Sequence, residues 1–237
     1  MILSFLFPKR CPVCDKVRPL SARKEEHFPV CAACYEKLVF VQEPFCKRCG
    51  KPLPAPDPEY CFECQKKEVS FHRNYAAMVY NAAAKNSMVL FKYHGRREFA
   101  DFYVRELLRQ HGGALRSLPL QAIIPVPIHR SRLMRRGYNQ AALLSEALSK
   151  ELHVPERRDI LFRTKKTIAQ KKLGPEARIR NLQDALRAEG DLSGLRHVLL
   201  VDDIYTTGST LEACSRVLTQ AGAAHVDCAT VCVVENE

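Results

Sequence analysis

The clearest hydrophobic pattern in the chain is the apolar run Val198–Val201, which gives way at once to polar residues. A short run of valine and leucine predicts a strand that is buried on both faces, as in a parallel sheet covered by helices. Periodic apolar positions then predict a helix from Ser209 to Gln220, which Gly222 ends as a C-cap. This part of the chain is therefore predicted to be a strand, a polar loop and a helix.

Similar patterns recur from about residue 70 onward. Helical periodicity predicts helices at Ala82–Tyr93, Glu98–Gln110 and Ala141–Leu152. Further strands are expected at Ala76–Tyr80, Ala122–Pro127, Ala185–Ala188 and Val226–Val234. Strands that alternate with helices predict an α/β fold around a mostly parallel sheet with flanking helices, with Ala76–Tyr80 as an antiparallel edge strand.

Composition and charge narrow the class of protein. A chain of 237 residues that is 46% hydrophobic has ample material for a folded core. No apolar run approaches the roughly 18 residues that span a bilayer, and Met1–Phe7 is too short for a secretory signal, so we expect a cytoplasmic protein without membrane insertion. The formal net charge of +11 favours anionic partners, either phosphorylated small molecules or nucleic acid.

The first part of the chain carries four Cys-x-x-Cys pairs. They are Cys11 with Cys14, Cys31 with Cys34, Cys46 with Cys49, and Cys61 with Cys64. Two pairs complete a tetrahedral Cys₄ site of the kind that zinc prefers, so four pairs predict two structural zinc ions. We expect the first pair to join the second and the third to join the fourth, with a cross-braced arrangement as the alternative.

Other uses of these thiols are disfavoured. Disulfides would not persist in a reducing compartment, whereas an iron–sulfur cluster or a redox dithiol uses the same residues and stays open. Charged residues replace the cysteines between Gln65 and Arg73, which predicts a zinc module over residues 1–68 and an α/β domain over residues 69–237. The remaining cysteines, Cys214, Cys228 and Cys232, lie on apolar periodicity and are expected to be core thiols.

The polar stretch after Val201 combines an acidic pair, Asp202 and Asp203, with a loop rich in hydroxyl groups. The loop residues are Thr206, Thr207, Gly208, Ser209 and Thr210. The first turn of a helix has unpaired amides and the positive end of the helix dipole, so this loop can hold a phosphate group. Two acids beside a phosphate require sugar hydroxyls or a magnesium ion between them. The alternative is an N-cap cluster beside a solvated acidic pair.

The order of four apolar residues, two acids and Thr-Gly-x-Thr resembles the signature of type I phosphoribosyltransferases for phosphoribosyl pyrophosphate (PRPP). The resemblance implies that Asp202 and Asp203 hold the ribose hydroxyls of PRPP, with Mg²⁺, and orient the sugar. It implies that Thr206–Thr210 hold the 5′-phosphate. The reaction would be displacement at C1 of the ribose without a covalent nucleophile.

A basic segment follows the predicted strand Ala122–Pro127. A strand that ends in a loop and leads into a helix is where open α/β sheets bind ligands. Its arginines, Arg130, Arg132, Arg135 and Arg136, could contact a pyrophosphate group or form a solvated helix surface. The same two alternatives apply to the basic turn Lys92–Arg97.

Five landmarks in order resemble the ComF family of competence-linked proteins. They are the cysteine pairs, Pro125-Val-Pro127, Arg130-x-Arg-x-x-Arg-Arg-Gly137-Tyr-Asn-Gln140, Thr167-x-x-Gln170-x-x-Leu173 and Arg178-x-x-Asn181. By analogy with amidophosphoribosyltransferases, Pro127, Ile128, His129 and Arg130 would line the pyrophosphate loop.

The long polar segment Arg163–Leu182 resembles the flexible hood that closes over PRPP in such transferases, with a basic connector as the alternative. Its candidate residues are Arg163, Thr167, Gln170, Lys172 and Arg178.

Two functions follow from these resemblances. In the first, a PRPP-binding, phosphoribosyltransferase-like protein acts in natural transformation and handles incoming single-stranded DNA with other competence proteins, such as a helicase. Because the chain has no tryptophan and few aromatic residues, its affinity for single strands would depend largely on phosphate contacts. In the second, the chain is an active Mg²⁺-dependent phosphoribosyltransferase on an unidentified acceptor, unrelated to DNA.

Overall fold

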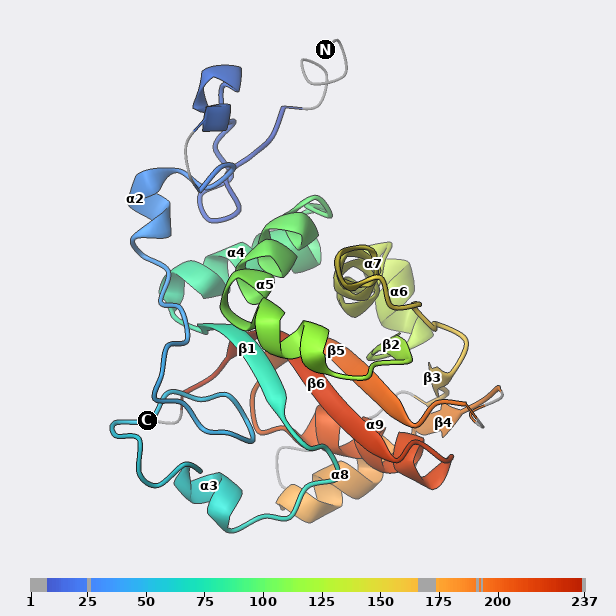
Figure 1. Ribbon diagram of the computed structural model, residues 1–237. Coiled ribbons are helices and arrows are strands. Elements are labelled where there is room, and N and C mark those ends of the chain that lie inside the picture. The colour runs from blue at the N-terminus through green and yellow to red at the C-terminus, as the bar shows by residue number, and fades with distance from the viewer. Residues whose placement is uncertain (1–7, 25–26, 166–173, 191, 193, 236–237) are drawn as a thin grey trace.

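A four-stranded parallel β-sheet organises the computed structural model, which describes residues 8–24, 27–165, 174–190, 192 and 194–235 (Figure 1). Its strands, in the order β1-β6-β5-β2, are β1 (Asn74–Val79), β6 (His225–Val233), β5 (His197–Tyr205) and β2 (Ala122–Pro125). Two short strands, β3 (Leu161–Arg163) and β4 (Leu186–Ala188), form a separate antiparallel pair. The predicted α/β fold around a parallel sheet is confirmed.

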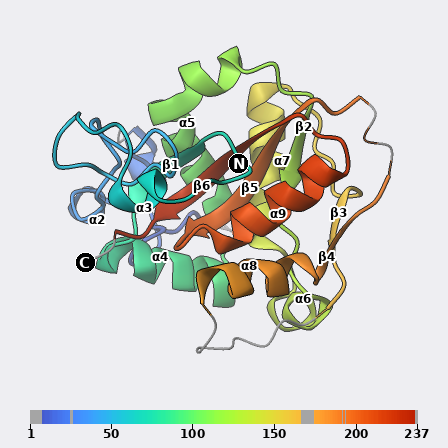
Figure 2. The same ribbon diagram turned by 90° about the horizontal axis from the view of Figure 1, so that it is seen from below.

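Helices cover both faces of the sheet. On one face lie α4 (Ala82–Tyr93), α5 (Phe99–Ser117) and α7 (Gln140–Leu152), and on the other lie α8 (Pro175–Gln183) and α9 (Ser209–Gln220). Figure 2, which shows the molecule from below, places α8 and α9 side by side in front of the sheet. The central strand β5 explains this layering, because Leu199 and Val201 pack with α5 and α7, whereas Val198 and Leu200 pack with α9.

Short polar side chains set the ends of several helices. The Asn81 side chain accepts a hydrogen bond from the amide of Ala84, at 2.9 Å, and begins α4. The Asn139 side chain begins α7 in the same way. The basic segment after β2 forms a helix, α6 (Arg130–Arg136), which Gly137 ends in the left-handed conformation. No residue of α6 is buried, so its basic side chains are accessible from solvent, and their contact with pyrophosphate stays a prediction.

Three features differ from the predictions. Strand β1 is an edge strand, as expected, but it pairs parallel with β6, because α4 and α5 carry the chain back across the sheet. Helix α5 continues beyond Gln110 to Ser117. Most of helix α8 lies inside the segment Arg163–Leu182 that was expected to be a long loop, and the last residue of β3, Arg163, begins that segment.

The outer edge of β1 is covered by residues 39–41. Phe40 and Met78 form an antiparallel bridge, and the amide of Val79 donates to the carbonyl of Val39 at 2.8 Å. The edge strand therefore has backbone partners on both sides.

The first cysteine-rich segment packs with the helices on one side of the sheet, and the second packs with the core on the other side. They contain a short 3₁₀ helix, η1 (Leu20–Lys24), and two single-turn helices, α2 (Ala32–Tyr35) and α3 (Phe62–Gln65). The Asn86 side chain of α4 donates to the carbonyl of Val13, and the Asn74 side chain of β1 donates to the carbonyl of Cys49. The predicted domain boundary at residue 68 lies between α3 and β1 and stays a prediction. In the ranges described, every helix is too short or too polar to cross a bilayer.

Candidate functional site

The acidic pair lies in the carboxyl half of β5. The strand is longer than predicted and continues through Asp202 and Asp203 to Tyr205. The two carboxylates have different neighbours: Asp203 accepts hydrogen bonds from the Lys92 ammonium group of α4, whereas Asp202 accepts one from the backbone amide of Asp203, at 2.8 Å. Successive side chains of a strand point to opposite faces of the sheet, so the two carboxylates lie on opposite faces of β5.

The environment of Asp202 favours its protonated form. Burial raises the pKa of Asp202 to about 7, and the negative charge of Asp203 acts in the same direction. Lys92 and Arg163 act in the opposite direction. A carboxyl group with this pKa can change its protonation state near neutral pH when a cation or a hydroxyl group approaches.

Arg163 of β3 interacts electrostatically with Asp202. Burial lowers the pKa of Arg163, the like charge of Arg132 lowers it further, and the charge of Asp202 raises it. The charge of Arg163 therefore acts on Asp202 and on Arg132 of α6. The fold thus brings a residue of the predicted hood to the acids.

The hydroxyl-rich loop forms the N-terminus of α9. Gly208 is the N-cap, with φ of 78°, and the first helical hydrogen bond runs from the Glu212 amide to its carbonyl at 2.8 Å. The amides of the intervening residues 209–211 precede that bond, so they have no partner within the helix. The hydroxyl groups of Thr207 and Ser209 lie 2.9 Å apart. This arrangement offers amide and hydroxyl donors to an anion.

A cavity of about 260 Å³ adjoins this loop. Its lining includes loop residues 206–209 and Tyr205, together with charged residues of both signs: Lys51, Lys67, Arg178, Glu63, Glu68, Glu176 and Glu212. Neither Asp202 nor Asp203 lines it. Of the predicted residues, the loop and Arg178 are thus brought together at the cavity, whereas the acids lie on β5 nearer Lys92 and Arg163.

The predicted pyrophosphate loop follows β2, which pairs with β5 beside the acids. The amide of Val126 donates to the carbonyl of Val201 at 2.9 Å, and its carbonyl accepts from the Asn139 side chain at 3.0 Å. Pro127 and Ile128 follow and are half-buried.

The remaining two residues of that prediction belong to the start of α6. The His129 ring accepts a hydrogen bond from the Ser131 amide and acts as the N-cap. Arg130 is exposed on α6. In this conformation the His129 ring organises the helix end.

The remaining hood residues divide into two groups. Arg163 and Arg178 lie in β3 and α8. Thr167, Gln170 and Lys172 lie outside the described residues.

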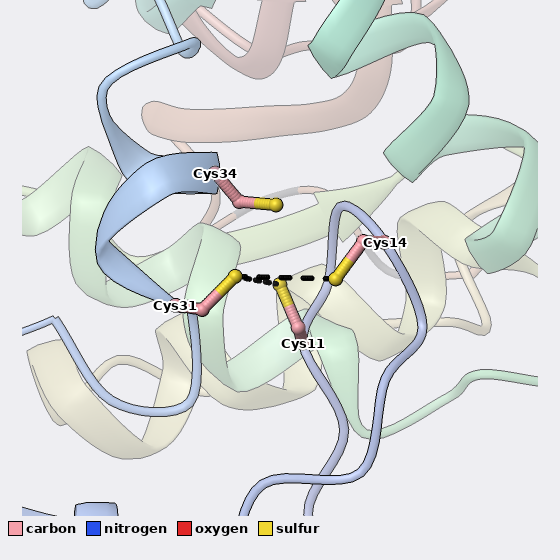
Figure 3. Close-up of side chains that lie close together, drawn as sticks. All are labelled: Cys11, Cys14, Cys31 and Cys34. Carbon is pink, nitrogen blue, oxygen red and sulfur yellow. Dashed lines mark hydrogen bonds between the residues drawn. The ribbon is translucent and has the colours of Figure 1, made fainter.

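Two clusters of four cysteines confirm the sequential pairing. Cys11, Cys14, Cys31 and Cys34 form one cluster (Figure 3), and Cys46, Cys49, Cys61 and Cys64 form the other. In each cluster the Sγ atoms all lie within 4.8 Å of one another.

The sulfur distances fit tetrahedral zinc. The Sγ atom of Cys31 lies 3.7 Å from that of Cys11 and 3.9 Å from that of Cys14, and the Cys49 and Cys61 sulfurs are 3.7 Å apart. A tetrahedron with Zn–S bonds of about 2.3 Å has edges of about 3.8 Å. None of the cysteines forms a disulfide in the described chain. Four protein ligands leave no open position, so both sites suit structural zinc.

Two contributors to the site had no signal in the sequence. Lys92 was considered only as part of a basic turn, yet it pairs with Asp203, 111 residues away. Tyr205 has no assigned role in the sequence analysis, yet it is 6% exposed and lies against Gly208. Both contacts depend on the tertiary fold.

The fold and the clusters define a class of protein, a double zinc ribbon joined to a phosphoribosyltransferase-type domain. Family models agree, since the Double zinc ribbon domain matches residues 2–65 and the Phosphoribosyl transferase domain matches residues 137–236. Among solved structures, orotate phosphoribosyltransferase from Aeropyrum pernix is 21% identical, with 61% of this chain and 64% of that chain covered and a TM-score of 0.38.

Full-length relatives place the chain more narrowly. DNA utilization protein YhgH of Shigella flexneri is 33% identical over 210 residues, which cover 87% of this chain and 91% of the relative. Competence protein F of Haemophilus influenzae is 35% identical, with coverages of 81% and 85%, and competence protein ComFC of Bacillus subtilis is 27% identical, with coverages of 82% and 80%. The chain belongs to the ComF family of competence-linked proteins.

Proposed function

We propose that the junction of β5 and α9 binds a ribose 5-phosphate ligand, and that this ligand is PRPP with Mg²⁺. The observation that carries the proposal is the order of two features along the chain: two carboxylates on β5, and then Gly208 in the left-handed conformation as the N-cap of α9. The loop amides would hold the 5′-phosphate, and the carboxylates would accept hydrogen bonds from the ribose hydroxyls. Carboxylate oxygens are also preferred ligands of Mg²⁺, which would neutralise the charge of the pyrophosphate group.

The contacts of the acids are compatible with this role. Each oxygen of an ionised carboxylate has two lone pairs, so Asp203 can accept from a sugar hydroxyl while it stays paired with Lys92. Arg163, near Asp202 and Arg132, supplies positive charge beside the acids for a pyrophosphate tail. The ligand would therefore lie among cations that balance its negative charge.

We further propose that the protein acts in natural transformation, in the cytoplasmic handling of single-stranded DNA. The names of the relatives, competence protein F and DNA utilization protein YhgH, support this role. The net charge of +11 and the exposed arginines of α6 suit a polyanion. Other competence proteins, such as a helicase, would be partners in that process.

A second candidate is turnover of PRPP on an unidentified acceptor. The match of residues 137–236 to the Phosphoribosyl transferase domain and the position of Arg163 near Asp202 favour it. Arg163 would stabilise the departing pyrophosphate while the acids orient the ribose. The two candidates share the same ligand site and differ in whether pyrophosphate is released.

Calorimetric titration with PRPP and Mg²⁺ tests the shared site. Wild-type protein should give saturable heat, and an Asp202→Ala/Asp203→Ala variant should give none. Asp159→Ala is the matched control, because Asp159 is exposed and pairs only locally with Arg157. Equal binding by wild type and the double variant would contradict the proposal. Pyrophosphate release in a screen of acceptors would establish turnover.

Single-strand binding tests the DNA role separately. Because phosphate contacts would supply most of the affinity, the dissociation constant for an oligonucleotide should rise steeply with salt. Binding that is absent at low salt would contradict a direct DNA contact by this chain.

A further inference from the structure

The second cysteine cluster (Cys46, Cys49, Cys61 and Cys64) and the proposed 5′-phosphate loop (Thr206–Thr210) both contribute residues to the lining of one cavity. Cys49, Cys61 and Cys64 line this cavity, and so do loop residues 206–209. Tyr205 also lines the cavity, and it belongs to the same buried core as Cys49 and Cys64. The cluster and the loop are therefore neighbours, although they are far apart in sequence.

Tyr205 provides the first link between them. A Cβ atom added to Gly208 would lie 2.3 Å from the Tyr205 hydroxyl oxygen and 2.7 Å from Cζ, so the ring packs directly under the loop glycine. The ring also meets Phe71 edge-on, with centroids 6.4 Å apart and an interplanar angle of 79°. Phe71 is 3% exposed and follows the last cysteine of the cluster by a short segment. The ring thus lies between this segment and the loop.

Glu212 provides the second link. This residue lies in the first turn of α9, is 3% exposed, and accepts hydrogen bonds from the amide of Ser70 at 2.7 Å and from its hydroxyl at 3.0 Å. The Glu212 amide also donates to the carbonyl of Gly208. Glu212 therefore donates the first backbone hydrogen bond of α9, and its side chain joins the helix to Ser70, in the segment that follows Cys64.

The cluster itself is fixed to the sheet on its other side. The Asn74 side chain donates to the carbonyl of Cys49 at 2.9 Å, and Arg48 donates to the carbonyls of Cys64 and Lys67. The Asn74 contact holds the Cys46–Cys49 turn against β1, and the Arg48 contacts join this turn to the one that carries Cys64, so both depend on the shape of the turns. A bound metal supplies that shape, because in small modules metal-binding free energy is folding free energy.

We propose that the metal of the second cluster positions the 5′-phosphate loop through Tyr205 and Glu212, so that affinity for a ribose 5-phosphate group depends on this metal. The first cluster packs on the opposite face, where Asn86 of α4 contacts it, and is not part of this linkage. The inference rests on the proposed function, since it assigns the loop a phosphate. Tyr205 and Glu212 are positioning residues.

The two clusters provide a matched comparison. A Cys61→Ser/Cys64→Ser variant and a Cys11→Ser/Cys14→Ser variant should each lose about one of two zinc ions by elemental analysis. Ribose 5-phosphate is the probe in calorimetry. The second-cluster variant should bind it about tenfold or more weakly, a loss of about 1.4 kcal/mol, whereas the first-cluster variant should stay within about threefold of wild type. Equal weakening in both variants, or none in either, overturns the inference.

Point variants test the linkage with both metals in place. Tyr205→Ala removes the ring and should weaken binding about tenfold at unchanged zinc content, whereas Tyr205→Phe keeps the ring and should restore the affinity of the wild type. A Tyr205→Ala variant that binds as tightly as wild type would overturn the linkage. This comparison stays informative if a cysteine variant fails to fold.

Hydrogen exchange separates this inference from the proposed function. Loop amides 206–212 should exchange faster in the second-cluster variant than in wild type, with or without ligand, and unchanged exchange overturns the inference. If the exchange differs as expected but wild-type protein binds neither ribose 5-phosphate nor PRPP, the linkage stands and the proposed ligand is wrong.

Discussion

The ammonium nitrogen of Lys92 lies 2.9 Å from both carboxylate oxygens of Asp203 and joins α4 to the carboxyl half of β5. The side chains are only 17% and 13% exposed. Water therefore screens this pair much less than it screens a surface pair, and each charge depends on the other for compensation.

Removal of Lys92 should destabilise the protein. In a Lys92→Met variant the Asp203 carboxylate is left without its partner beside Asp202, and we expect a loss of about 2–4 kcal/mol in the free energy of unfolding by urea at pH 7. A Lys92→Met/Asp203→Asn variant should recover most of that loss. Lys150→Met is the control, because its pair with Glu146 is largely exposed to solvent, and it should destabilise the protein much less than Lys92→Met does. Similar losses of stability in Lys92→Met and Lys150→Met would show that the Lys92–Asp203 pair contributes no more than an exposed ion pair.

Stability should fall as pH rises through the range in which Asp202 ionises. An aspartate in the unfolded chain has a pKa of about 3.9, and burial raises that of Asp202 to about 7 in the folded protein. The folded state therefore binds more protons between these values, so this residue lowers stability progressively from about pH 4 to pH 7.

Replacement of Asp202 by Asn should remove this dependence. Without ligand, Asp202→Asn should be more stable than wild type at pH 8 by about 1–3 kcal/mol, and the difference should shrink toward pH 4. Asp159→Asn is the opposite case, since Arg157 lowers the pKa of Asp159, and it should not stabilise at pH 8. Urea unfolding at several pH values measures both variants. A constant difference across this range would exclude ionisation as its cause.

Alanine at Gly208 should disturb the phosphate loop. The backbone there has φ of 78°, and the new methyl group would meet the Tyr205 ring, so we expect a loss of about 1–3 kcal/mol in stability and weaker binding of ribose 5-phosphate. Gly113→Ala in α5 is the matched control, because an added Cβ there meets nothing within 4 Å and should stabilise by up to about 1 kcal/mol. Thermal unfolding and calorimetry compare the two. Unchanged ligand affinity in Gly208→Ala would argue against a phosphate at this loop.

Both metal sites should contribute to folding. Purified protein should contain about two zinc ions per chain, and chelation should lower the midpoint of thermal unfolding, because four thiolates left without metal would repel one another. Elemental analysis and calorimetric scanning before and after chelation measure these effects. An absorption spectrum with charge-transfer bands in the visible range would instead indicate an iron–sulfur cluster.

Local patterns predicted most of the central fold. The run Val198–Val201, the acids and the hydroxyl-rich loop are contiguous, so periodicity and turn chemistry were enough to place β5 and α9. The Cys-x-x-Cys spacing likewise predicted both clusters, because each pair chelates from a single turn.

Long-range contacts could not be predicted in this way. The direction of β1 relative to its partner β6 depends on the path of the chain between the two strands. The short strand β3 is defined by its pairing with β4. In the site, the partner of Asp203 is on a distant helix, and the ring of Tyr205 gains its role only from the glycine packed on it. None of these relationships leaves a periodic trace in the sequence.

The bridge between Phe40 and Met78 has a consequence for how the chain can be divided. A fragment that began at residue 69 would leave the amide of Val79 without the carbonyl of Val39 and would present β1 as an open template. Such a fragment would be prone to self-association through that strand. Residues 39–41 thus protect the edge of β1 from pairing with a second chain.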